Sequence, residues 1–274
     1  MATIAKPLIE TSPRPDLLSG TPRAGFIDRW IYVFTAASFI VIVLAGFIPD
    51  SLQNLAMIKA HQRAPYSLIA DLHAVVMGSF LLLLLAQTVL VATGRTDLHR
   101  RLGLVGMVLA PALVVVGSIL APANYHGVWQ GAHFGPPPVQ AALTPVVPLL
   151  ENILLLQMRV GILFTLFLTM GLLARGRDAG FHKRMMILGT AVTLPAAFHR
   201  MEWLPTTLPT SPLSLDLYVL LALAPMFAWD VIRNRSVHRA YWVWLPIYAA
   251  ASLVVISLWD TPAWHATARH IMGV

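Results

Sequence analysis

The sequence predicts an all-α, polytopic membrane protein, and three observations support that prediction. The 274 residues are 57% apolar and only 11% charged, and the mean hydropathy is +0.71. A soluble domain of this length needs more polar and charged surface residues than this composition contains. Apolar runs of about 20 residues also recur, which is the length that crosses a bilayer core as a helix.

Seven transmembrane helices are predicted from these runs. Ser67 precedes the second run as a capping residue, and Gly94 follows it as a stop signal. Pro111 and Pro195 fall inside the third and fifth runs, where a missing backbone hydrogen bond predicts a kink. The predicted spans cover roughly residues 30–49, 68–93, 98–121, 150–175, 181–204, 213–232 and 241–259.

Two segments outside the apolar runs have their own predictions. Residues 1–29 are polar and contain proline, which predicts a flexible cytoplasmic N-terminal arm before a single transmembrane domain over 30–274. The one long connection, 122–149, reads PANYHGVWQGAHFGPPPVQAALTPVVPL and is too rich in glycine and proline for a span. Trp129 and Phe134 favour an external interfacial loop there.

A short motif occurs twice in the same setting. GRTDLHRRLG at 94–103 and GRDAGFHKRM at 176–185 both join one apolar run to the next, with a proline 12 or 13 residues after the histidine. This echo predicts a two-helix repeat, related by an axis along the membrane normal. The second to fifth spans would then form a central four-helix bundle.

The distribution of cations predicts the orientation. Of the 19 Lys and Arg residues, 14 fall on the face that holds the N-terminus and 5 on the opposite face. Short loops rich in Lys and Arg stay in the cytoplasm, so the N-terminus is predicted inside and the C-terminus in the periplasm.

The net charge of +7 does not indicate a nucleic-acid partner. Its cations lie in short loops beside apolar spans, where anionic lipid headgroups of the bilayer are the fitting partners. The sequence is also compatible with a role as a subunit of a larger membrane complex.

The candidate site lies near the outer face. His73 and His199 each fall about five residues inside a span, at similar depth, and Arg159 lies about 13 Å deep. Ionisable groups at such depth usually face the bundle interior and need a partner. Arg200 adds a second cation, and the supporting carboxylates are Asp71, Glu151 and Asp216.

Two interpretations of this outer group stay open. His73 and His199 are suitable axial ligands for a b-type haem or ligands of a transition metal, with Arg159 and Arg200 on propionates or an anionic substrate. In the alternative no cofactor binds, the histidines make ordinary hydrogen bonds, and the arginines form buried ion pairs that join helices.

A second group lies at the inner face, on the two echo segments. Since His73 and His99 map to opposite faces, they cannot share one metal. The inner residues are predicted to bind lipid headgroups, with a second cofactor between the two histidines as the alternative; they are His99, Arg100, Arg101, His182, Lys183 and Arg184.

Several classes of chemistry are excluded. The chain has no cysteine, which rules out disulfides, thiolate metal sites and Cys-ligated clusters. No lysine lies in the last span, so retinal has no attachment point. No nucleotide-binding loop, HExxH zinc motif or Gly-x-Ser-x-Gly elbow occurs.

Three stretches resemble a large family of uncharacterised bacterial multi-pass inner-membrane proteins. They are LHAVVMGSFLLLLLAQTVLVATGRTDLHRRLG (72–103), FHKRMMILGTAVTLPAAFHR (181–200) and TPAWHATAR (261–269). The resemblance implies a bacterial inner-membrane location and transfers no catalytic residue. The histidine pattern is also similar to di-haem membrane cytochromes b, whose ligands lie within spans rather than in loops or first turns.

Two functions follow as hypotheses. The first is electron transfer by a haem b or transition metal held at the outer site. The second is a non-catalytic role, as an accessory subunit or as a binder or carrier of a lipid or small anion. Whether the protein is an enzyme stays open.

Overall fold

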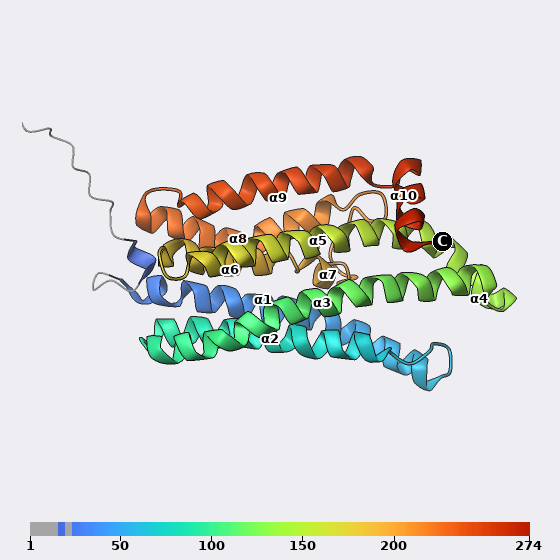
Figure 1. The fold of residues 1–274 in the computed structure, drawn as a ribbon, viewed down its shortest axis with the longest axis horizontal. Helices are drawn as coiled ribbons and strands as arrows, with labels where there is room; N and C mark the ends of the chain where they lie inside the picture. The colour runs from blue at the N-terminus through green and yellow to red at the C-terminus, as the bar shows by residue number, and fades with distance from the viewer. Residues whose placement is uncertain (1–15, 20–23) are drawn as a thin grey trace, which may run out of the picture.

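The computed structural model describes residues 16–19 and 24–274, and within these it is all-helical (Figure 1). The α-helices are α1 (Phe26–Lys59), α2 (Leu68–Ala92), α3 (Thr96–Phe134), α4 (Pro137–Leu143), α5 (Val147–Ala174), α6 (Ala179–Ala191), α7 (Pro195–Phe198), α8 (Leu213–Asn234), α9 (Arg239–Leu258) and α10 (Pro262–Met272). Two 3-10 turns, η1 (Leu17–Ser19) and η2 (Thr144–Val146), complete the described elements.

The long helices run side by side along the longest axis (Figure 1). One end holds the start of α1 and the α2–α3, α5–α6 and α8–α9 connections; we call it the basic end. The other holds α4, α10 and the α1–α2 turn; we call it the α10 end. α5 packs against α6, α3 and α9, while α1 packs against α2, α7 and α8.

Six helices are long and apolar enough to cross a membrane, which supports the predicted membrane location. They are α1, α2, α3, the continuous run Pro137–Ala174 that contains α4, η2 and α5, and then α8 and α9. The remaining predicted span, 181–204, is not one helix. α6 ends at Ala191 and α7 begins at Pro195, because a proline ring clashes with the carbonyl four residues earlier and has no N–H to donate. The kink predicted at Pro195 is therefore a break.

The predicted loop over 122–149 is wrong in its first half. α3 continues through Pro122 to Phe134, and α4 and η2 fill most of the rest. Burial explains the difference, because Tyr125 is 1% exposed and Ala132 6% exposed. Packing of that helix face outweighs the low helix propensity of its glycine and proline residues.

The predicted flexible arm is also partly wrong. Residues 1–15 and 20–23 lie outside the described residues, but η1 docks on the bundle with Leu18 only 4% exposed. The Leu17 N–H donates to the side-chain oxygen of Asn234 in α8 at 3.0 Å. α1 begins at Phe26 because Asp28 accepts the Gly25 N–H at 2.8 Å and caps the helix.

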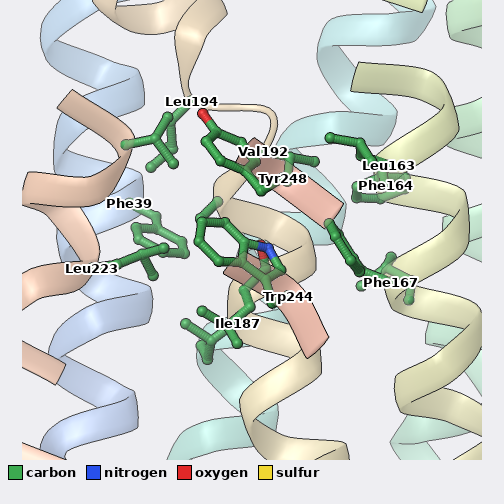
Figure 2. Packing of buried hydrophobic residues seen from close by; sticks show 14 of the residues in the cluster. Phe39, Leu163, Phe164, Phe167, Ile187, Val192, Leu194, Leu223, Trp244 and Tyr248 are labelled. Carbon is green, nitrogen blue, oxygen red and sulfur yellow. The ribbon is translucent and has the colours of Figure 1, made fainter. Parts of the chain in front are cut away.

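The core lies where α1, α5, α6, α8 and α9 meet. In Figure 2, Trp244 and Tyr248 of α9 lie among Phe39 of α1, Leu223 of α8 and Phe167 of α5. All five side chains are less than 5% exposed. α6, which ends where the predicted span 181–204 is interrupted, is nearly enclosed by these elements. This enclosure explains how a helix too short to cross a membrane alone remains in the bundle.

Gly46 of α1 permits close contact with α7. A Cβ at this position would overlap the carbonyl oxygen of Ala197. We expect Gly46→Ala to push α1 off α7 and lower the free energy of unfolding by about 1–3 kcal/mol, measured by thermal melting in detergent. Gly78→Ala is the control, because a Cβ there meets no atom within 4 Å; equal melting of both variants would contradict this packing.

Candidate functional site

Arg159 of α5 and Asp216 of α8 form a buried, two-pronged ion pair. Nη2 lies 2.7 Å from Oδ1, and Nη1 lies 2.9 Å from Oδ2. The two side chains are only 3% and 7% exposed. Two parallel charge-assisted hydrogen bonds are the strongest arrangement available to these groups. Of the predicted carboxylate partners, Asp216 is therefore the one that holds Arg159.

Two residues of α9 complete this pair. The Tyr248 hydroxyl donates to Asp216 Oδ1 at 2.7 Å, and the Ser252 hydroxyl accepts from Arg159 Nη1 at 2.9 Å. The Arg159 guanidinium also lies 5.5 Å from the centre of the Tyr248 ring, within cation–π range. The cluster joins α5, α8 and α9. This arrangement agrees with the alternative in which Arg159 forms a buried ion pair between helices.

Glu151 belongs to a separate cluster at the α10 end. Its carboxylate is fully buried and accepts Nε–H of Arg269 at 2.8 Å, and Nδ1 of His265 lies 2.5 Å from its other oxygen. The indole N–H of Trp264 donates to the Glu151 backbone carbonyl at 2.9 Å. All three partners lie on α10, so Glu151 docks that helix on α5 instead of supporting the predicted outer site.

His73 lies on the face of α2 that packs on α3. Its Cε1 is 3.7 Å from where a Cβ of Gly117 would stand, and its Nδ1 is buried without a hydrogen-bond partner. Asp71, predicted as a supporting carboxylate, is exposed in the first turn of α2.

His199 and Arg200 follow α7, which packs on α1 and α8. His199 is exposed. The Arg200 Nε lies 3.5 Å from Asp50 Oδ2, and its guanidinium stacks 4.3 Å from the Phe47 ring centre. The residues predicted to form one outer site thus lie in three different surroundings: His73 beside α3, Arg159 beside α8 and α9, and His199 with Arg200 beside α1.

At the basic end, the rings of His99 and His182 lie next to each other, edge to face. They lie in the first turns of α3 and α6, with ring centroids 6.4 Å apart and ring planes at 75°. Both helices pack on α5, and the two rings meet beside it. The structure therefore brings together the two histidines of the sequence echo.

Two further features surround this pair. His182 Nδ1 lies 2.8 Å from the carbonyl oxygen of Gly171 in α5. A carbonyl only accepts, so Nδ1 carries the hydrogen and Nε2 is left with a lone pair. Nδ1 of His99 and both amide atoms of Gln87 are buried without hydrogen-bond partners among the described residues, and such groups usually bind something.

Arg184 anchors an ion-pair network next to the histidines. It is fully buried and donates to Asp230 at 2.5 and 2.7 Å and to Asp16 at 2.8 and 3.2 Å. Tyr241 donates to Asp230 at 2.9 Å, and Lys183 lies 2.9 Å from Asp16. Lys183 and Arg184, predicted to bind headgroups, are thus held by carboxylates of the same chain.

Asp16 remains ionised in this network. Burial alone would raise its pKa, but the Arg184 hydrogen bond and the charge of Lys183 outweigh burial and hold the pKa well below its usual range. Arg100 and Arg101, by contrast, are exposed. Of the six predicted inner residues, these two remain available to headgroups.

His238 makes the stability of the basic end pH-dependent. Its Nδ1 accepts the Ala240 N–H at 3.1 Å and caps α9, which requires the neutral ring. Burial lowers its pKa below 6.5, and Arg184 lowers it further against the opposite effects of Asp16, Asp230 and Asp178. The unfolded chain therefore binds a proton at a higher pH than the folded chain does. The contribution of the neutral His238 ring to the free energy of unfolding is present in full above pH 6.5 and is lost as the pH falls below that value.

We expect the melting temperature in detergent to fall between pH 7.5 and 5. In His238→Ser, whose hydroxyl caps a helix without titrating, the fall should be smaller. Asp16 does not contribute in this range because its pKa lies far lower. An identical pH profile in the variant would contradict the assignment.

Several of these residues were missed from sequence. Asp230 lies inside an apolar run, and a carboxylate at that position was a usable signal. Gln87 also lies inside a span, but an uncharged amide there is a weaker sign of a functional site than a carboxylate. Asp16 had no local signal, because its partner Arg184 lies 168 positions along the chain.

No known protein family, curated protein or solved structure matches the chain. The geometry of the described residues is therefore the basis for a functional assignment.

Proposed function

We propose that this membrane protein binds one haem b at the basic end, with His99 and His182 as axial ligands, and transfers electrons. The observation that carries the proposal is the pair of imidazoles from two helices with ring centroids 6.4 Å apart. Because metal–imidazole bonds are about 2 Å long, two imidazoles on opposite sides of one iron have centroids about 6 Å apart.

The donor set favours haem over a bare metal ion. A porphyrin supplies four of the six iron ligands, so two imidazoles complete the coordination. No three His, Cys, Asp or Glu side chains within residues 16–19 and 24–274 gather closely enough to hold a metal by themselves. Haem chemistry would be one-electron transfer, which needs no nucleophile from the protein.

The surroundings of the pair support a ligand role. Metal-ligating histidines usually donate their second N–H to a carbonyl or carboxylate, as His182 does to Gly171. Arg100 follows His99, and Arg175 ends α5 beside this region, so both guanidinium groups are candidates for haem propionates. Buried Gln87 supplies a further unpaired amide.

The proposal includes a location. By the excess of cations at the basic end, we assign that end to the cytoplasm of a bacterial inner membrane. The haem would then lie near the inner surface. The outer location at His73 and His199 is a weaker alternative for haem or metal, because these histidines lie beside different helices.

The test is the haem content of the full chain. Protein expressed with sufficient haem and purified in detergent should contain about one haem b per chain by the pyridine haemochrome assay, with matching iron. Protein without a Soret band would contradict the proposal. So would stoichiometric metal without haem, which would favour a metal site.

A non-catalytic role is the second candidate. It is favoured by the ion pairs that Arg159 and Glu151 form with groups of the same chain, since these charges then join helices. A haem-free protein whose His182→Ala variant only melts earlier would support this role.

A further inference from the structure

The helix α10 is held on the bundle by charged groups as well as by packing. It turns away from the direction of the long helices (Figure 1), and it packs on α5 and α3. Trp264 and Ala268 form its buried face. From the same helix, His265 and Arg269 reach the buried carboxylate of Glu151. The attachment of α10 therefore depends on the charge that these side chains carry.

The ring of His265 lies between two carboxylates. Its Nδ1 is 2.5 Å from Glu151 Oε2, and its Nε2 is 3.1 Å from Asp260 Oδ1. An ionised carboxylate only accepts hydrogen bonds, so both contacts are hydrogen bonds only when both ring nitrogens carry a hydrogen. Arg269 donates to the other oxygen of Glu151 at 2.8 Å, an arrangement that fits the ionised form of that carboxylate. The docked helix therefore fits a positively charged His265.

The second carboxylate, Asp260, is fixed in place beside the ring. It lies in the connection from α9 to α10 and adopts the left-handed conformation, with φ of 57°. Its N–H donates to Oδ1 of Asn152 in α5 at 3.0 Å, and Nδ2 of Asn152 donates to Asp260 Oδ1 at 3.4 Å. The Asp260 side chain is nevertheless 66% exposed. Through this residue, His265 can exchange its proton with solvent without opening of the bundle.

Within the described part of the chain, the charges around His265 balance only when its ring is protonated. Glu151 and Asp260 supply two negative charges, and Arg269 supplies one positive charge. From α3, the neutral Tyr125 hydroxyl donates to Glu151 Oε1 at 3.3 Å. Loss of the ring proton leaves two carboxylates with one cation, and one ring nitrogen then points a lone pair at a carboxylate oxygen.

We propose that α10 is a pH-sensitive switch, docked while His265 is protonated and released more often as the pH rises. An undocked α10 would have its imidazole in water, where a histidine loses its proton at about pH 6.5. Because the docked helix holds that proton, docking is most stable below this pH and weakens above it. The sign is opposite to that of His238 at the basic end. The proposal does not depend on haem, since the switch and the histidine pair share no residue.

Hydrogen exchange of the α10 backbone amides, measured by mass spectrometry on the detergent-purified full chain, tests the proposal. Labelling times at pH 6 and pH 9 are scaled to the intrinsic exchange rate at each pH. We expect the protection of α10 to fall at least about tenfold from pH 6 to pH 9, as for the loss of one charged hydrogen bond. The peptides of α9 should keep their protection.

Two variants assign the response to one ring. His265→Gln has an amide that donates hydrogen bonds without titrating. We expect weak protection of its α10 at both pH values, with no change between them. His270→Gln is the matched control, because His270 is exposed on the same helix; this variant should keep the response of the wild type.

Three outcomes would overturn the proposal. The first is equal protection of α10 at pH 6 and pH 9 in the wild type, a comparison that needs no substitution. The second is a pH response that persists in His265→Gln. The third is a loss of protection at pH 9 that is the same in α9 as in α10, which would show that the bundle opens as a whole.

Discussion

Replacing Asp216 with Asn is expected to lower the free energy of unfolding by about 3–5 kcal/mol. The variant leaves Arg159 buried inside a membrane-spanning helix, 3% exposed, without its carboxylate. Removing one member of a buried ion pair costs more than the pair contributes, because the remaining charge is desolvated without compensation. Thermal melting or denaturant titration in detergent measures the loss.

Two controls separate this effect from a general loss of charge. The double variant Arg159→Met with Asp216→Leu removes both charges and should recover much of the stability. Arg239→Gln breaks an ion pair with Asp178 at the surface, where the Arg239 side chain is 64% exposed and the Asp178 side chain 33% exposed. This variant should change the free energy of unfolding by less than about 1 kcal/mol. A double variant as unstable as Asp216→Asn would show that the charge is not the cause.

Replacing His182 with Ala is expected to lower haem content at least about tenfold. In the proposed site the change would remove one of the two imidazoles that hold the haem, so the haem would be held by His99 alone. Absorption of the purified variant at the Soret band, normalised to protein, measures the loss. The same result is expected for His99→Ala, because in the proposal both imidazoles hold the same haem.

His73→Ala and His199→Ala are the matched controls. Both remove an imidazole from the opposite half of the molecule and should leave haem content unchanged. If either control loses haem while His182→Ala retains it, the cofactor binds at the outer site predicted from sequence, and the assignment to the basic end is wrong.

Much of the fold could be predicted from the apolar runs, because length and hydropathy are local properties. Six predicted spans correspond to helices suited to a membrane. The exceptions depend on packing. The segment 181–204 is apolar enough, yet Pro195 divides it, and its burial keeps it inside the bundle. The segment 122–134 has a loop composition, yet the buried face around Tyr125 keeps it helical.

The site was less predictable because its partners are far apart in sequence. Sequence identified Arg159 as a charge that needs a partner, but several carboxylates fitted, and only the fold selects Asp216. Similar depth does not specify which helix a side chain faces: His73 lies beside α3, whereas His199 follows α7, which packs on α1 and α8. The echo placed His99 and His182 at one end, and the packing on α5 brings their rings together.

Electron paramagnetic resonance of the oxidised protein tests the central claim most directly. If His99 and His182 hold one iron, the wild-type protein gives the low-spin ferric signal of two imidazole ligands. Each single alanine variant at these positions then either loses the haem or gives a high-spin signal. A wild-type protein without a haem signal, or a low-spin signal that survives both substitutions, would contradict the account.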